Sequence, residues 1–147
     1  MNRIILALLM SLFMAACAPD AERAAPAPIV GPNVELVNGL MAAFNDHDAE
    51  AMRAFWSPDV TWVEISGDQS SIVTSTAQIL YEETKAYFEA FPSVQSSLES
   101  IAVNGNYVTA VERPVWEENG ERKSQASVVV YEIDNGKVVR FWYYPPQ

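Results

Sequence analysis

The chain has 147 residues and a formal net charge of −10 at pH 7, from 19 acidic and 9 basic side chains. This balance excludes a basic nucleic-acid footprint, and we expect phosphate-rich partners to be repelled. One cysteine and one histidine exclude an intramolecular disulfide and argue against zinc, which prefers several His or Cys ligands. No glycine-rich phosphate loop, dinucleotide fingerprint or nucleophile elbow occurs, so the sequence predicts no metal and no cofactor.

The first 17 residues have the pattern of a bacterial lipoprotein signal. Arg3 makes the amino end positive, and residues 4–15 form an apolar stretch that is shorter than the about 20 residues needed to span a bilayer. Met-Ala-Ala over residues 14–16 leads directly into Cys17, which resembles a lipobox. The alternative is an ordinary secretory signal followed by a chance cysteine. We expect residues 1–16 to be removed and Cys17 to be lipidated, which attaches the protein to a membrane.

Residues 17–32 are rich in alanine and proline and have no core-forming pattern. Such a segment is typical of an extended tether. Ala18, rather than aspartate, follows the cysteine, and in proteobacterial lipoproteins this resembles sorting to the outer membrane. The sequence therefore predicts a domain over residues 33–147 in the cell envelope, at the periplasmic face of the outer membrane.

The first half of this domain predicts helices around one strand. Asn33 is expected to cap a helix with apolar residues at i, i+3 and i+4, and Asp48 to cap a short second helix ending at Ser57–Pro58. Residues 60–65 alternate as a strand, with Trp62 and Glu64 on one face. Residues 67–71 are predicted to be a loop. A capping box over residues 75–78 begins a third helix that ends near residue 91.

After residue 92 the pattern changes to strands. Asn-Gly pairs at 104–105, 119–120 and 135–136 favour hairpin turns. They delimit strands at about residues 94–103, 107–117, 123–133 and 138–144. For the strand over residues 107–117, the sequence leaves open which face points inward. Either Arg113 or Glu112 and Pro114 lie on the inner face. The order predicts an α+β fold with three N-terminal helices packed on a curved antiparallel sheet.

Two segments carry a resemblance to a known family. Residues 44–62 and 134–144 resemble the nuclear-transport-factor-2-like superfamily and, within it, the SnoaL-like group of ketosteroid isomerase and polyketide cyclase relatives. The resemblance covers about residues 33–146. It implies a cone-shaped, cystatin-like half-barrel, a blind apolar pocket between the sheet and the long helix, and a homodimer formed through the outer sheet face. Because members include isomerases, cyclases, epoxide hydrolases, dehydratases and proteins without chemistry, the fold does not settle the function.

Glu64 is the catalytic candidate that the resemblance implies. Ketosteroid isomerases carry a general-base carboxylate on this strand, five residues after an aspartate, and Asp59 and Glu64 keep that spacing. Beside Trp62, burial would raise the pKa of Glu64 toward a range useful for proton transfer. The alternative is a strand-end carboxylate that faces water or pairs with Arg113 or Arg140.

The resemblance also shows departures. The positions of the two isomerase oxyanion donors are occupied by Phe44 and Val129, and losing one such donor typically lowers the rate by about 10²–10³. Tyr87, Tyr131 or Tyr143 would have to replace them. His47, the only imidazole, is interpreted as part of the turn between the first two helices.

Three functions follow from these residues. The first is a lipid-anchored binding domain for a small apolar or aromatic molecule. Its candidate ligand-binding residues are Phe44, Trp62, Tyr87, Arg113, Val129 and Phe141. The second is an isomerase, lyase, cyclase or dehydratase with Glu64 as base and Tyr131 or Tyr143 as electrophilic partner. The third is a dimeric interaction module without chemistry.

Overall fold

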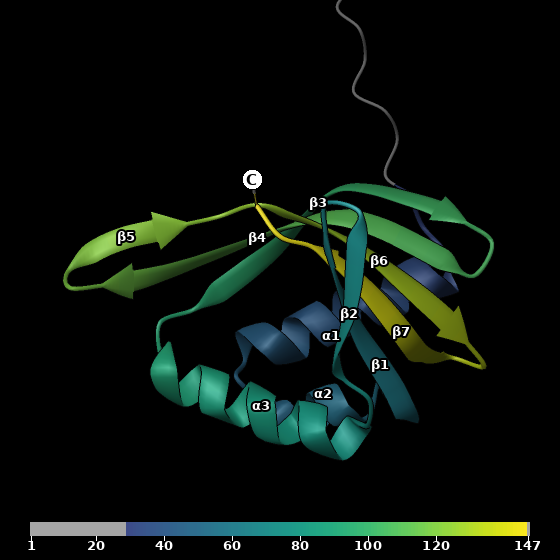
Figure 1. Ribbon diagram of the computed structural model, residues 1–147, viewed down its shortest axis with the longest axis horizontal. Coiled ribbons are helices and arrows are strands. Elements are labelled where there is room, and N and C mark those ends of the chain that lie inside the picture. The colour runs from purple at the N-terminus through teal and green to yellow at the C-terminus, as the bar shows by residue number, and fades with distance from the viewer. Residues whose placement is uncertain (1–28, 147) are drawn as a thin grey trace, which may run out of the picture.

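The computed structural model describes residues 29–146 (Figure 1). Its helices are α1 (Pro32–Asn45), α2 (Ala49–Arg53) and α3 (Ala77–Ala90). Its strands are β1 (Trp56–Ser66), β2 (Gln69–Thr74), β3 (Gln95–Asn104), β4 (Tyr107–Glu118), β5 (Glu121–Ser124), β6 (Ser127–Asp134) and β7 (Lys137–Tyr144). The expected signal peptide, the lipidated Cys17 and the tether up to residue 28 lie outside the described residues. Over residues 29–146, every helix is too short or too polar to cross a membrane.

All seven strands belong to one mixed sheet, in the order β2-β1-β7-β6-β4-β3, with β5 added to the end of β4. β1 and β7 are parallel, with Thr61 beside Arg140 and Trp62 beside Phe141. The other pairs are antiparallel. The α+β class is as predicted, and β3, β4, β6 and β7 form the expected antiparallel meander. The expected all-antiparallel sheet is wrong, because β1 pairs parallel to β7.

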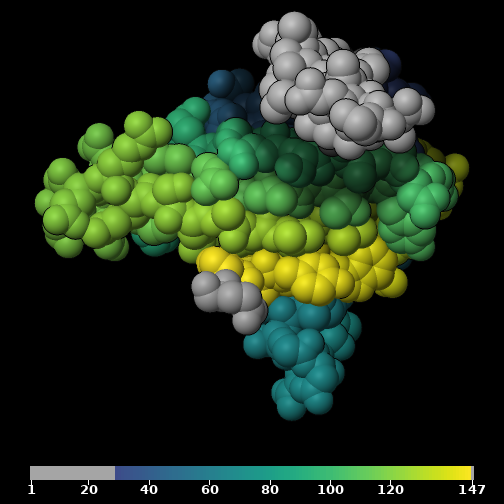
Figure 2. Space-filling view, turned by 90° about the horizontal axis from the view of Figure 1, so that it is seen from above, coloured from purple at the N-terminus to yellow at the C-terminus, as the bar shows by residue number. Residues whose placement is uncertain are grey.

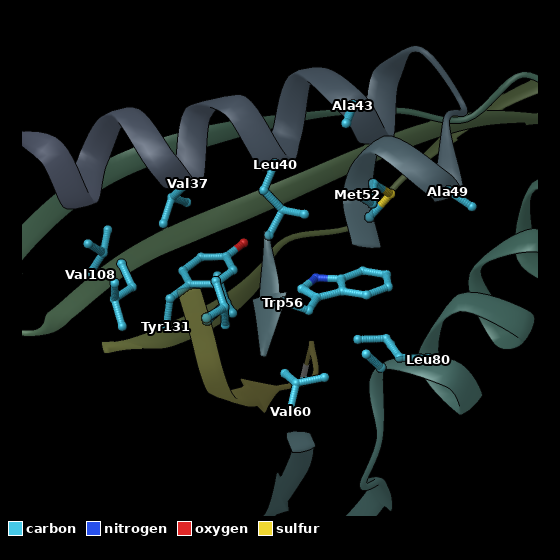
Figure 3. Packing of buried hydrophobic residues seen from close by; sticks show 14 of the residues in the cluster. Val37, Leu40, Ala43, Ala49, Met52, Trp56, Val60, Leu80, Val108 and Tyr131 are labelled. Carbon is cyan, nitrogen blue, oxygen red and sulfur yellow. The ribbon is translucent and has the colours of Figure 1, made fainter. Parts of the chain in front are cut away.

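The three helices lie on one side of the sheet, and the core fills the space between them (Figure 1). α1 and α2 contribute Val37, Leu40 and Met52, while the sheet contributes Trp56, Val60, Val108, Tyr131 and Val138. Figure 3 shows several of these side chains converging from helix and sheet. Burying each large apolar side chain contributes about 1.5–3 kcal/mol, so this layer is the main source of stability.

The helix limits differ slightly from those predicted. α1 begins at Pro32, with Gly31 at the cap position, while Asn33 instead donates to the carbonyl oxygen of Gly105 at 3.2 Å. Asp48 caps α2 as predicted, since its Oδ1 accepts from the amide of Ala51 at 2.8 Å. Thr76, and not the expected Ser75, caps α3 through the amide of Ile79 at 3.2 Å.

The second helix ends earlier than predicted, and β1 is correspondingly longer. α2 stops at Arg53, and Trp56 is the first residue of β1 rather than part of the helix. Pro58 disfavours helical backbone at Ser57, which agrees with the place of Ser57 in β1.

Two strand predictions were wrong. The expected loop over residues 67–71 contains the start of β2, which forms a hairpin with β1 around Gly67, whose φ is +63°. Five of the six β2 residues are exposed, so the alternating apolar pattern that identifies a strand is absent. The strand expected over 123–133 is two strands, β5 and β6, which pair with different parts of β4.

Candidate functional site

A cavity of about 520 Å³ lies between the helices and the sheet, within the size range of small-molecule sites. Its walls come from α1, α2, α3 and most strands of the sheet. The aromatic part of the wall consists of Phe44, Trp56, Trp62, Tyr87, Tyr131, Phe141 and Tyr143. Trp62 packs edge to face on Phe141 and Tyr143, with ring centroids 6.3 and 5.9 Å apart. The cavity is therefore a preformed aromatic site with few polar groups.

Glu112 and Tyr131 form the main polar pair in the wall of this cavity. They lie on the neighbouring strands β4 and β6, and the Tyr131 hydroxyl donates a hydrogen bond to Oε1 of Glu112. Burial raises the pKa of Glu112, while the hydrogen bond from Tyr131 acts in the opposite direction. Burial, followed by the nearby charge of Glu112, holds the pKa of Tyr131 well above its usual value. Tyr131 therefore stays protonated and acts as the donor of the pair, while burial favours the neutral form of Glu112.

Two further tyrosines bring hydroxyl groups to the cavity. The hydroxyls of Tyr143 and Ser127 are hydrogen-bonded at 2.6 Å, and burial is the largest cause of the raised pKa of Tyr143. Tyr87 reaches the cavity from α3, and burial raises its pKa as well. Both hydroxyls therefore remain protonated at neutral pH.

Three buried polar atoms in residues of the cavity wall lack a hydrogen-bond partner among the described residues. They are the indole nitrogens of Trp56 and Trp62 and the Ser96 hydroxyl. Figure 3 shows the Trp56 indole and the Tyr131 hydroxyl turned toward the same space beneath Leu40.

Most of the candidate residues from the sequence lie around this one cavity. Phe44, Trp62, Tyr87, Val129, Tyr131, Phe141 and Tyr143 all line it. Phe44 comes from α1 and Tyr87 from α3, and their rings are 6.2 Å apart. The resemblance-based placement of the pocket between sheet and long helix therefore agrees with the geometry.

Glu64 and Arg113 are outside the lining residues. Glu64 lies beside Tyr143 in the pairing of β1 with β7, so it is near the cavity, and its catalytic role stays a prediction. Arg113 faces the other side of the sheet, where its Nε and Nη2 donate to Glu99 at 2.8 and 3.2 Å. The ion pair of Glu64 with Arg113 or Arg140, one form of the alternative to a catalytic role, does not occur among the described residues, because these two arginines contact Glu99 and Glu132.

The open question of the β4 face is answered by Glu112 and Pro114, which line the cavity. Glu112 is the functional candidate that the sequence reasoning did not select. The alternation of residues along β4 places Val108, Ala110, Glu112 and Pro114 on one face of the strand. The three apolar residues of this face are buried, and this apolar pattern was the signal for the inward position of Glu112. Arg113 was kept as a ligand-binding candidate because a cation suits an anionic or carbonyl ligand, but its side chain lies on the opposite face of β4.

His47 has the turn role that was expected. Its φ is +55°, its Nε2 is 2.7 Å from the carbonyl oxygen of Val94, and its ring stacks on Phe88 at 4.6 Å. It is not one of the cavity-lining residues. Over the described range, no three His, Cys, Asp or Glu side chains converge into a possible metal site.

The profile of the SnoaL-like domain family matches residues 37–141 of the chain. The chain belongs to the SnoaL-like domain family. The sheet, helices and cavity described above therefore make up a SnoaL-like domain. No curated protein matches the sequence.

Solved structures with the same fold support this assignment. An uncharacterized cystatin-fold protein from Novosphingobium aromaticivorans is 18% identical, with a TM-score of 0.66 over 76% of this chain and 96% of that one. AclR, a hydroxylase candidate from Streptomyces galilaeus, is 26% identical, with a TM-score of 0.60 and coverages of 76% and 86%. A SnoaL-like polyketide cyclase candidate from Jannaschia sp. CCS1 is 18% identical, with a TM-score of 0.63 and coverages of 81% and 88%.

Proposed function

We propose that the SnoaL-like domain binds a small apolar or aromatic molecule in the cavity. The observation that supports this most is the combination of a preformed aromatic wall with one polar pair, Glu112 and Tyr131. An apolar wall supplies affinity through buried area, and a few polar groups fix the orientation of the ligand. An unfilled apolar cavity costs stability, so a ligand that fills it stabilises the fold.

Acid–base catalysis is the second candidate, and Glu112 supports it better than Glu64 does. A carboxyl group whose pKa is raised by burial works as an acid or base closer to neutral pH. Tyr131 or Tyr143 would act as the electrophilic partner that polarises a carbonyl oxygen. Such an isomerase, cyclase or dehydratase needs no cofactor, and replacing Glu112 with glutamine would abolish turnover while leaving the cavity intact.

Ligand extraction and thermal shift together test the binding function. Native mass spectrometry of the purified protein, followed by solvent extraction, is expected to release a small molecule with aromatic or apolar character. Val73 provides a control, because it lines the cavity from β2 and is 43% exposed, so a tryptophan there narrows the cavity at little cost to folding. The Val73→Trp variant is expected to lose the ligand and its stabilisation. If the extracted molecule raised the Tm of the wild-type protein and of Val73→Trp equally, the proposal would be contradicted.

We also propose that the domain is lipid-anchored through Cys17 in the cell envelope. The support is the lipobox-like sequence pattern before Cys17. A lipidated cysteine would carry more than one acyl chain, and more than one chain is needed for stable attachment. Labelling with a fatty-acid probe is expected to mark the wild-type protein and not Cys17→Ala. A soluble, unlabelled wild-type protein would exclude the anchor.

A homodimer through the outer sheet face is the remaining proposal. Figure 2 shows this face, with the strands of the sheet side by side and the β1–β2 hairpin projecting from its edge. Val103, Tyr107, Val128 and Tyr144 are each 41% exposed. The ring centroids of Tyr107 and Trp142 are 6.1 Å apart, and the two neighbouring rings add apolar surface to this face. The intact mass in native mass spectrometry is expected to be that of a dimer, and Val128→Glu to give a monomer.

A further inference from the structure

The charges of the cavity wall have one sign. Glu83 on α3 and Glu112 on β4 are the charged side chains among its lining residues, which include no lysine, arginine or histidine of the described chain. A wall with two acidic groups and an apolar remainder disfavours an anionic ligand, since each anion loses hydration and gains no counter-charge. We therefore expect carboxylates and phosphates to bind this cavity poorly.

Five of the seven basic side chains over residues 29–146 contact groups that are not part of the cavity wall. The salt bridges join Arg113 to Glu99, Arg140 to Glu132, and Lys123 to Glu121. Arg53 and Lys85 lie 5.5 and 5.4 Å from the ring centre of Tyr81, which is not a lining residue. No cation of the described range neutralises Glu112, which is bonded to Tyr131 alone.

Glu112 has an oxygen available for a ligand. Tyr131 donates to Oε1, and no hydrogen bond from residues 29–146 reaches Oε2. An ionised carboxylate can accept several hydrogen bonds, so Oε2 of this cavity-lining residue remains available as an acceptor. A donor with a positive charge suits it best, because charge-assisted hydrogen bonds are about twice as strong as neutral ones.

The aromatic wall favours the same charge. The faces of indole, phenol and phenyl rings carry negative electrostatic potential and attract cations, and tryptophan does so most strongly. Trp62, Phe141 and Tyr143 lie together on β1 and β7, and Phe44 and Tyr87 lie opposite on the helices. A cationic group inside the cavity is therefore close to ring faces as well as to Glu112.

We propose that the ligand of this cavity is an organic cation, an apolar or aromatic molecule whose protonated amine is held by Glu112. This inference rests on the proposed binding function and adds the charge and the donor group of the ligand. Glu83, at the helical side of the wall, adds attraction for the same charge during binding. A neutral carbonyl compound that accepts hydrogen bonds from the tyrosines is the competing ligand, and the experiment below distinguishes it.

Three probes of one shape separate the effect of charge from that of apolar contact. Naphthalen-1-ylmethylamine, naphthalen-1-ylmethanol and 1-naphthoic acid are cationic, neutral and anionic at pH 7. We expect calorimetry to show the amine binding at least 10-fold more tightly than the alcohol, and the acid binding more weakly than either. The Val73→Trp variant is expected to lose the amine and the alcohol, which assigns both to the cavity.

Variants then assign the charge preference to Glu112. Glu112→Gln keeps the shape of the side chain and an oxygen for Tyr131, and it is expected to remove most of the amine preference while changing alcohol affinity less than 3-fold. Glu118→Gln is the matched control, because this exposed residue of β4 carries the same charge outside the cavity wall. It is expected to leave all three affinities within 2-fold. Retained alcohol binding shows that each variant is folded.

The outcomes separate this inference from the proposed function. If the alcohol binds as tightly as the amine, or if Glu112→Gln leaves the amine preference intact, the cation proposal is wrong and the binding function stands. If none of the three probes binds to the wild-type protein, and extraction yields no small molecule, the binding function itself fails.

Discussion

Tyr131 on β6 donates a hydrogen bond to Glu112 on β4, so two titrating groups of the cavity whose pKa values burial raises form one unit. Neither residue is exposed, and both lie against the rings of the aromatic wall. Tyr143 on β7 and Tyr87 on α3 are the other titrating groups that feel the charge of Glu112. The properties of this pair can be measured without knowing the ligand.

Glu112→Gln is expected to stabilise the empty domain at neutral pH. Burial raises the pKa of Glu112 in the folded state, so the carboxyl group favours folding when protonated, and that contribution is lost as the pH rises through the folded pKa. Glutamine removes the free-energy cost of burying an ionised carboxylate. The Tm is therefore expected to rise at pH 7.5, and the gain to shrink toward pH 5. A constant gain at all pH values would contradict this cause.

Tyr131→Phe is expected to raise the pKa of Glu112 further. The hydrogen bond from Tyr131 is the contribution that lowers this pKa, because a donor stabilises the charged carboxylate. Carboxyl ¹³C chemical shifts followed through a pH titration measure the change directly. The control is Tyr143→Phe, whose hydroxyl is bonded to Ser127 and not to Glu112, and it is expected to shift the titration much less. Equal titrations in the two variants would exclude the assigned bond.

Gly39→Ala is expected to destabilise the domain although alanine is the better helix former. A Cβ at this position of α1 would lie 2.9 Å from Cε1 and Cζ of Phe55, so the ring must move, which typically costs about 1–3 kcal/mol. The double variant Gly39→Ala with Phe55→Leu removes this contact. It is expected to recover part of the about 1 kcal/mol by which alanine favours a helix over glycine. Urea unfolding of the two single variants and the double variant measures the coupling. Additive effects would show that Phe55 is not the obstacle.

Asp48→Ala is expected to lower the free energy of unfolding by about 1 kcal/mol. The Asp48 carboxylate accepts the amide of Ala51 at the start of α2, and a five-residue helix has few other local contacts to compensate. Asn at this position keeps an acceptor oxygen and is expected to lose much less. The same measurement by urea unfolding applies, and an equal loss in both variants would point to charge rather than to the cap.

The elements defined by local signals were predictable from the sequence. The cap at Asp48 and the turns at Asn119–Gly120 and Asn135–Gly136 depend on neighbouring residues, and in both turns each residue has a positive φ. The strand limits after residue 92 follow largely from these turns. At Asn104 the residue remains in β3 and the turn moves to the next two positions, because strand pairing with Tyr107 competes with the turn preference.

Features set by contacts between distant residues were not predictable. β2 is polar and exposed, so only its pairing with β1 makes it a strand. The alternation of apolar and polar residues in β1 and β7 does not indicate that these two strands are parallel. Which face of β4 points inward, and so the position of Glu112, stayed open in the sequence, because apolar residues occur on both faces of this strand. The aromatic lining was easier, since Trp62, Phe141 and Tyr143 lie in phase on strands whose faces were assigned correctly.

The parallel pairing of β1 with β7 also sets the order in which this domain can be completed. Thr61 and Arg140 are bonded across 79 positions of the chain, so β1 has its hairpin partner β2 but no neighbour on its other edge until β7 has been synthesised. Contacts of such long sequence separation slow folding, because the intervening loop must be closed first. A nascent chain that has reached only the helices therefore cannot close its sheet. Among the described residues, the last strand to be synthesised is therefore the one that completes the pairing of the first.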